Sequence, residues 1–327
     1  ILSDEIYIKL NKGWFQMIRY YKTIDNKLEK LNSFEEGCWI NLVEPNQSEI
    51  NEIANLLNID IDSIKSALDE EERSRIDVED NHTLILIDIP VDESDDKSSH
   101  YTTIPLGIIL LENALLTVCT AQTKILNDFI VGHIKEFYTY KKTRFILQIL
   151  HKNATYYLHY LRRINKMTTI IEKEIYNSMK NKQLIQLLEL EKSLVYFSTS
   201  LKANELVLNK MVRTSSIKKY SEDEDLLEDV LVENRQAVEM ATIYGDILSR
   251  IMDAFSAIIS NNQNGVMQFL TSVTLITTIP TIVSGFFGMN VGGIPYANDV
   301  NGFWIVMLIT TLICLVITFF MSRNKLL

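Results

Sequence analysis

Residues 266–290, VMQFLTSVTLITTIPTIVSGFFGMN, decide the fold of this chain, because they form a long apolar segment without a charged side chain. The uncharged stretch extends from residue 254 to residue 298, and Val266 to Phe287 is long enough to cross a hydrocarbon core of about 30 Å as a helix. A second uncharged segment, Phe303 to Met321, follows after a short linker. The sequence therefore predicts two membrane-spanning helices.

Basic residues flank the two predicted spans on one side of the membrane. Arg250 precedes the first span, and Arg323 and Lys325 follow the second. The positive-inside rule places such flanks in the cytoplasm. We therefore expect a plasma-membrane protein with both termini cytoplasmic, a first transmembrane helix at 263–290, an external loop at 291–302, a second transmembrane helix at 303–322 and a cytoplasmic tail at 323–327.

Polar and small residues recur along one face of the first span, at helical spacing. The members of this polar stripe are Asn264, Thr271, Thr274, Thr278, Thr281, Gly285 and Gly288. The opposite positions are apolar, as in Phe269, Ile276 and Ile282, and Pro280 is expected to kink the helix. The stripe lines a water-filled passage or packs against other helices, and periodicity alone leaves both open. Because two spans cannot enclose a channel, a pore requires several copies of the chain.

The rest of the chain is acidic. The net charge is −10, and residues 1 to 253 hold 41 Asp and Glu against 30 Lys and Arg, since only Asp299, Arg323 and Lys325 are charged beyond that point. This balance argues against a nucleic-acid partner and suits cations. The three cysteines are too widely spaced for a disulfide framework, and the first residues lack the apolar core of a signal peptide. We expect this part to face the cytosol.

Residues 1–120 are predicted to form a cytosolic α/β domain. Short runs rich in Val, Ile, Leu and Thr predict strands, and the last two strands flank Glu112-Asn113 as a hairpin. Apolar residues at helical spacing predict two helices between the first two strands. The strands are expected at Trp39–Val43, Thr83–Pro90, Ile104–Leu111 and Ala114–Thr120, and the helices at Ser48–Leu57 and Ile61–Leu68.

Residues 121–262 are predicted to form a helical stalk region. Two series of apolar residues at intervals of three or four predict a helical hairpin. A third series from Ala237 to Ile258 has no proline to end it before the membrane, so one helix is expected from about Glu222 to Phe287, roughly 100 Å long at ~1.5 Å per residue. The predicted fold class is α+β, with an N-terminal α/β domain, a long helical stalk and two C-terminal transmembrane helices.

Gly288-Met289-Asn290 at the end of the first span, a short loop, a second span and a brief basic tail together resemble the CorA family of magnesium and cobalt transporters. The resemblance implies a funnel-shaped homopentamer that carries Mg2+, and also Co2+ and Ni2+, without an organic cofactor. It implies that Asn290 holds a hydrated ion at the mouth, and that Met267 and Leu270 form a hydrophobic constriction. The pore-lining residues that it implies are Asn264, Met267, Leu270, Thr271, Thr274, Thr278, Thr281 and Gly285.

The resemblance also implies regulation by the transported ion, through Mg2+ that bridges acidic residues of neighbouring cytosolic domains. Asp229 matches one side of this site by position, and Asp77, Glu79 or Asp80 is expected on the other side. Asp253 lies near the predicted pore entrance and is a further candidate. Loss of the cation would leave like charges facing each other and would open the pore. The alternative is that these carboxylates are solvated acidic surfaces.

The external loop leaves the identity of the ion open. It has one carboxylate, Asp299, where magnesium-selective relatives typically carry a more acidic stretch, and Val291-Gly-Gly-Ile-Pro295 resembles the loop of the related ZntB zinc transporters. A Zn2+ transporter is therefore the first alternative, although the histidines show no tight ligand spacing. The second alternative is a membrane-tethered sensor or scaffold that transports nothing. An enzyme is not expected, because the sequence has no GxSxG motif and no P-loop.

Overall fold

The computed structural model of the chain describes residues 18–94, 100–177, 181–214, 220–296 and 299–323. The first 17 residues of the predicted α/β domain, residues 297 and 298 of the predicted loop and the predicted tail after Arg323 lie outside the described residues. The chain divides into two compact units, Ile1–Arg250 and Ile251–Leu327.

The first unit is built on a seven-stranded sheet with the strand order β2-β1-β3-β7-β6-β5-β4. β3 and β7 pair in parallel, and every other neighbouring pair is antiparallel. The strands are β1 Ile18–Ile24, β2 Lys27–Leu31, β3 Trp39–Val43, β4 Arg75–Val78, β5 His82–Asp92, β6 Tyr101–Leu111 and β7 Leu115–Cys119. The four predicted strands are confirmed as β3, β5, β6 and β7, and β6 and β7 form the predicted hairpin.

The sequence pattern misses strands β1, β2 and β4, which lie toward the two edges of the sheet. β1 and β2 form a hairpin whose turn residues, Asp25 and Asn26, have φ angles of 47° and 62°. Two consecutive positive φ angles are typical of a two-residue type I′ turn. The Asp25-Asn26 dipeptide was therefore the sequence signal that could have predicted this hairpin. β2, Lys-Leu-Glu-Lys-Leu, keeps three of its five side chains exposed, and its apolar pattern is correspondingly weak.

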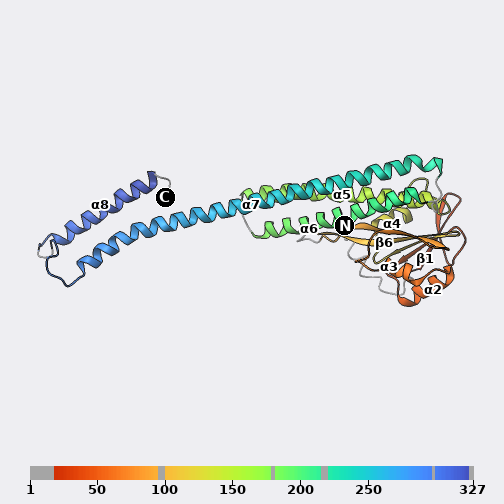
Figure 1. Cartoon of the computed structure of the whole chain (residues 1–327), viewed down its shortest axis with the longest axis horizontal. Coiled ribbons are helices and arrows are strands. Elements are labelled where there is room, and N and C mark those ends of the chain that lie inside the picture. The colour runs from red at the N-terminus through yellow and green to blue at the C-terminus, as the bar shows by residue number, and fades with distance from the viewer. Residues whose placement is uncertain (1–17, 95–99, 178–180, 215–219, 297–298, 324–327) are drawn as a thin grey trace, which may run out of the picture. The chain divides into compact units, whose positions relative to one another are not determined.

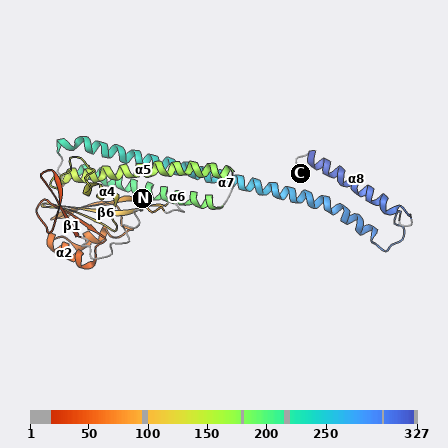
Figure 2. The same ribbon diagram turned by 180° about the vertical axis from the view of Figure 1, so that it is seen from behind.

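Helices cover both faces of the sheet (Figure 1). The two predicted short helices, α2 (Gln47–Leu57) and α3 (Ile61–Ser66), pack on one face, and α4 (Lys124–Ile130), α5 (Lys142–Asn177) and α6 (Asn181–Arg213) pack on the other. Trp39 lies fully buried under the second set, where its Nε1 donates a hydrogen bond of 2.8 Å to Thr117 Oγ1. Figure 2 shows the same two layers from behind.

A short 3-10 helix, Ser221–Asp223, leads into α7 (Glu224–Phe287), which confirms the predicted long helix. Ion pairs hold its start to the beginning of α5. Arg144 Nη1 lies 2.8 Å from Asp223 Oδ1, and Lys141 Nζ lies 2.8 Å from Glu222 Oε1. The hydrogen bond from Lys141 lowers the pKa of Glu222. Asp223 is buried, and its pair with Arg144 ties the start of α7 to the start of α5.

Candidate functional site

The second unit contains the C-terminal part of α7 and α8 (Gly302–Arg323), the two helices among the described residues that are long and apolar enough to cross a membrane. α8 coincides with the predicted second span and is a candidate membrane helix. Large apolar side chains of this unit are exposed in the single chain; Leu315 is 64% exposed and Phe319 is 70% exposed. Exposed apolar surface of this extent indicates contact with lipid or with other protein.

α8 packs along α7 on one side only (Figure 1). Ser272 of α7 is 1% exposed, Ile276, Ile279 and Val283 are half-buried, and Cys314 Sγ of α8 lies 3.9 Å from the Ile276 carbonyl oxygen. At about 100° per residue, these four α7 residues centre roughly 150° from the polar stripe. The second predicted span therefore covers the face opposite the stripe, and the stripe is exposed along its whole length in the single chain.

The hydroxyl groups of the polar stripe donate to carbonyls of their own helix. Thr271 Oγ1 lies 2.8 Å from Met267 O, and Thr274 Oγ1 lies 2.8 Å from Leu270 O. Thr278 and Thr281 make the same contact one turn back, at 2.7 Å and 3.0 Å. Because the hydroxyl proton is used in this way, the oxygen lone pairs remain as acceptors on the exposed face. The stripe is thus a row of oxygen acceptors, which suits a hydrated cation.

The Gly288-Met289-Asn290 motif follows directly on the last residue of α7. Gly288 N donates to Ser284 O at 2.9 Å, and Met289 N donates to Phe286 O at 3.3 Å, so the turn extends the helix end. A Cβ atom at Gly288 would lie 3.1 Å from Ser284 O, which is tighter than an ordinary contact. Asn290 is exposed, and its amide makes no hydrogen bond within the described ranges. The motif therefore presents a free amide at the end of the polar stripe.

The loop after the motif returns to α8 through a tight turn. Asp299 Oδ1 accepts a hydrogen bond of 3.1 Å from Asn301 N, and Gly302 N donates to Asp299 O at 3.0 Å. A Cβ atom at Gly302 would lie 2.2 Å from Tyr296 O, so this position requires glycine. The one carboxylate of the predicted external loop is therefore engaged in starting α8.

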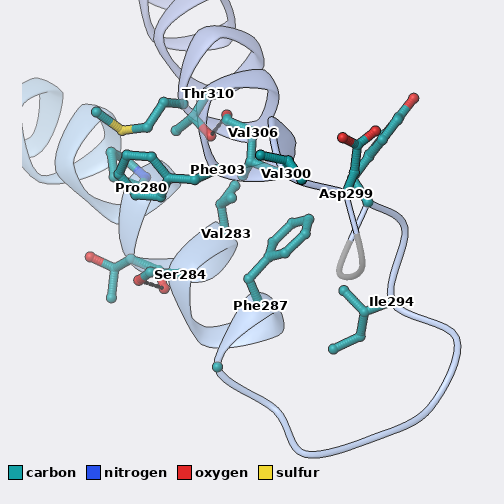
Figure 3. Close-up of a pocket in the computed structure, with 15 residues that line it drawn as sticks. Pro280, Val283, Ser284, Phe287, Ile294, Asp299, Val300, Phe303, Val306 and Thr310 are labelled. Carbon is teal, nitrogen blue, oxygen red and sulfur yellow. Dashed lines mark hydrogen bonds between the residues drawn. The ribbon is translucent and has the colours of Figure 1, made fainter.

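A cavity of about 860 Å³ lies between the end of α7, this loop and the start of α8. Figure 3 shows Val283 and Phe287 of α7 facing the start of α8, where Phe303 and Val306 complete an apolar wall. Thr281 lines the cavity and also belongs to the stripe, whereas Met289 and Asn290 do not line it. The cavity lies on the side of α7 that faces α8, and it meets the polar stripe at Thr281 and at Gly288, which also lines it.

The predicted regulatory carboxylates are not brought together in the single chain. Asp77 forms an ion pair with Arg75, and Glu79 Oε2 lies 3.6 Å from Nε2 of His82. The remaining three, Asp80, Asp229 and Asp253, are exposed, the last two on α7. Within the described ranges no three His, Cys, Asp or Glu side chains are arranged to hold a metal ion.

Two residues of the site escaped the sequence reasoning. Ser272 stands within the threonine-rich span but is buried, and Cys314 was considered only as one of three widely spaced cysteines. The helical spacing of α7 could have identified Ser272, because this residue lies outside the polar stripe. Nothing in the sequence indicated that Cys314 meets the carbonyl of Ile276.

Comparison with known proteins places this arrangement in a family. The sequence profile described as "CorA-like Mg2+ transporter protein" matches residues 34–323. The cobalt/magnesium transport protein CorA of Methanocaldococcus jannaschii is 27% identical over 312 residues, covering 92% of this chain and 95% of that protein. The complete structure of the CorA magnesium transporter from the same organism superposes with a TM-score of 0.80 at 25% identity, over 95% of this chain and 99% of that one.

The fold of the first unit also occurs in a neighbouring group. The ZntB cytoplasmic domain of Vibrio parahaemolyticus has a TM-score of 0.61 at 8% identity, covering 76% of this chain and all of that domain. At this identity the likeness concerns the fold alone. The family profile, in contrast, spans both units, the Gly-Met-Asn motif and both candidate spans. This chain therefore belongs to the family of CorA-like Mg2+ transporters.

Proposed function

We propose that this chain is the subunit of a homo-oligomeric channel that admits divalent cations through the plasma membrane, with Mg2+ as the main ion and Co2+ and Ni2+ also carried. One observation carries the proposal: α8 covers the face of α7 opposite the polar stripe, so the row of hydroxyl oxygens is free to line a shared passage. Helix packing within the chain, the competing explanation of the stripe, uses the other face.

Several copies of α7 around an axis would place the stripes toward one another. Following the family resemblance, we propose a funnel-shaped homopentamer with both termini in the cytoplasm. Its mouth would be Gly288, Met289 and Asn290, and its lining Asn264, Met267, Leu270, Thr271, Thr274, Thr278, Thr281 and Gly285. A ring of Asn290 amides holds Mg2+ through its water shell, which this ion loses reluctantly. A potential of 100 mV, negative inside, contributes about 4.6 kcal/mol to the influx of a divalent ion, so no nucleotide is needed.

Regulation by internal Mg2+ is part of the proposal. Asp229 on α7 would share the ion with Asp77, Glu79 or Asp80 of a neighbouring subunit, and Asp253 would bind near the pore. The exposure of Asp229 and Asp80 supports contact with another chain. Asp77 is engaged by Arg75 and Glu79 lies beside His82, which makes Asp80 the better candidate for the second side.

Ion flux into proteoliposomes tests the proposed function. We expect potential-driven Mg2+ uptake that falls about tenfold or more in Asn290→Ala, since about 1.4 kcal/mol at the mouth corresponds to a factor of ten. Asn301→Ala, in the same loop but outside the motif, is the matched control and should transport normally. Zn2+ uptake that follows a pH gradient would establish the zinc alternative, and a protein that carries neither ion would be a sensor or scaffold.

A further inference from the structure

Pro280 interrupts the hydrogen bonding of α7 inside the predicted first span. Proline has no backbone N–H, so the carbonyl of Ile276, four residues earlier, loses the donor that an α-helix normally supplies. The neighbouring hydroxyls do not replace it: Thr278 Oγ1 donates to Thr274 O, and Thr281 Oγ1 donates to Thr277 O. In a hydrocarbon environment bulk water does not reach such a carbonyl, and a side chain of a neighbouring helix is one of the groups that can provide the donor.

The side chain at that carbonyl is a thiol of α8. Cys314 Sγ lies 3.9 Å from Ile276 O, within the range of a weak S–H hydrogen bond. Cys314 is half-buried, and Ile276 belongs to the covered face of α7. The carbonyl of Cys314 is itself bonded by Thr318 Oγ1 at 2.7 Å, which fixes the turn of α8 that carries the thiol.

We propose that Cys314 is a positioning residue, whose thiol donates to the Ile276 carbonyl that Pro280 deprives of its usual partner. The contact fixes α8 against the turn of α7 that contains Pro280. Thr274 and Thr278 lie two residues before and two residues after Ile276 and are exposed, so the position of this turn relative to α8 sets where the two hydroxyls lie. The contact itself does not depend on the proposed function; its consequence for ion flux does.

A double-mutant cycle on the full-length protein in detergent tests the contact. Cys314→Ala should lower the melting temperature by about 2 °C, the scale of one weak hydrogen bond. In the Pro280→Ala background, Cys314→Ala should lower the melting temperature by at most about half as much, because alanine restores the N–H that bonds to the Ile276 carbonyl. The loss of thiol volume is the same in both backgrounds, so it cancels in the comparison. Thr311→Ala is the control, since this exposed hydroxyl of α8 bonds to its own helix at Met307 O, 2.8 Å away. The changes in melting temperature caused by Thr311→Ala and by Pro280→Ala should be additive.

Equal losses from Cys314→Ala in both backgrounds would overturn the contact, whatever the protein transports. For the positioning role, Cys314→Ala should change Mg2+ flux in proteoliposomes about twofold or more, while Thr311→Ala leaves it unchanged. Normal flux in Cys314→Ala beside normal wild-type flux would overturn that role. Absence of flux in the wild-type protein would count against the proposed function alone, and the thermal cycle would still decide the contact.

Discussion

Ser272 is 1% exposed and Thr274 is exposed, although a single residue separates them in α7. Both hydroxyls donate to carbonyls of their own helix, at 2.8 Å each. What differs is the surface that each one meets. Ser272 lies against α8, and Thr274 belongs to the polar stripe, so the two faces of this helix serve packing and the ion pathway separately.

Substitutions at this pair should separate stability from transport. Ser272→Leu places extra volume between α7 and α8 and should cost about 1–3 kcal/mol of stability, the usual range for overpacking. Thr274→Val keeps the volume, removes the oxygen acceptor and should reduce Mg2+ flux while the melting temperature stays nearly constant. Thermal unfolding in detergent and proteoliposome flux measure the two effects. If Thr274→Val reduces flux only because less of the protein is folded, the assignment of Thr274 to the ion pathway is contradicted.

The ion pair at the start of α7 should dominate the stability of that junction. Asp223 is buried, its side chain 5% exposed, and Arg144 Nη1 lies 2.8 Å away. Arg144→Ala leaves a buried carboxylate without this partner and should cost about 2–3 kcal/mol. Lys141→Ala breaks the neighbouring pair with exposed Glu222 and should change the melting temperature little. Similar losses from both variants would show that burial of Asp223 does not matter.

Asp88 of β5 gives the first unit a pH dependence. Burial raises the pKa of its carboxyl above the usual 3.8, and hydrogen bonds from Ser200 and Ser74 oppose the shift only in part. Around it, Asn204 and Asn153 donate to the Asp88 carbonyl oxygen at 2.8 Å and 3.0 Å, which ties β5 to α6 and α5. A raised pKa means that the folded state binds the proton more tightly than the unfolded state. The resulting stabilisation is full below the unfolded pKa and is lost as the pH rises through the folded pKa.

Asp88→Asn should therefore raise the melting temperature at neutral pH, where the buried charge is unfavourable, and the gain should shrink as the pH falls toward 3.8. Thermal scans of both proteins across this pH range measure it. Asp92→Asn is the matched control on the same strand, because it removes the ion pair with Arg163 at 2.9 Å and should not stabilise. A gain for Asp88→Asn that is independent of pH would refute the titration of Asp88.

The elements that the sequence predicted are those with long or continuous apolar patterns. β3, β5, β6 and β7 form the middle of the sheet and are buried on both faces, and α7 has a continuous apolar series that ends at Phe287 as expected. β1, β2 and β4 were missed because strands near an edge need few apolar residues. Their pairing depends on neighbours that are distant in the sequence or on a two-residue turn.

For the candidate site, the periodicity of polar residues predicted the polar stripe, but it did not predict which face of α7 is covered by α8. That depends on where α8 packs, and α8 is apolar all round, so its own pattern selects no face. Contacts such as Arg144 with Asp223, 79 positions apart, follow from the tertiary fold alone. The acidic residues were predicted by type and position, whereas their partners, as with Asp77 and Arg75, are set by local geometry.

Asp229 provides the last prediction, which concerns regulation. If Mg2+ bridges this exposed carboxylate to a neighbouring subunit, Asp229→Asn weakens the site, and the internal Mg2+ concentration for half-inhibition of flux should rise about tenfold, the effect of about 1.4 kcal/mol. Glu228→Gln removes an adjacent exposed charge from the same helix and should leave that concentration unchanged. Proteoliposomes loaded with graded Mg2+ measure both variants. A bridging site distinguishes one carboxylate from its neighbour, whereas a diffuse electrostatic field does not. If Asp229→Asn and Glu228→Gln shift the half-inhibiting Mg2+ concentration equally, Mg2+ responds only to the summed surface charge of α7.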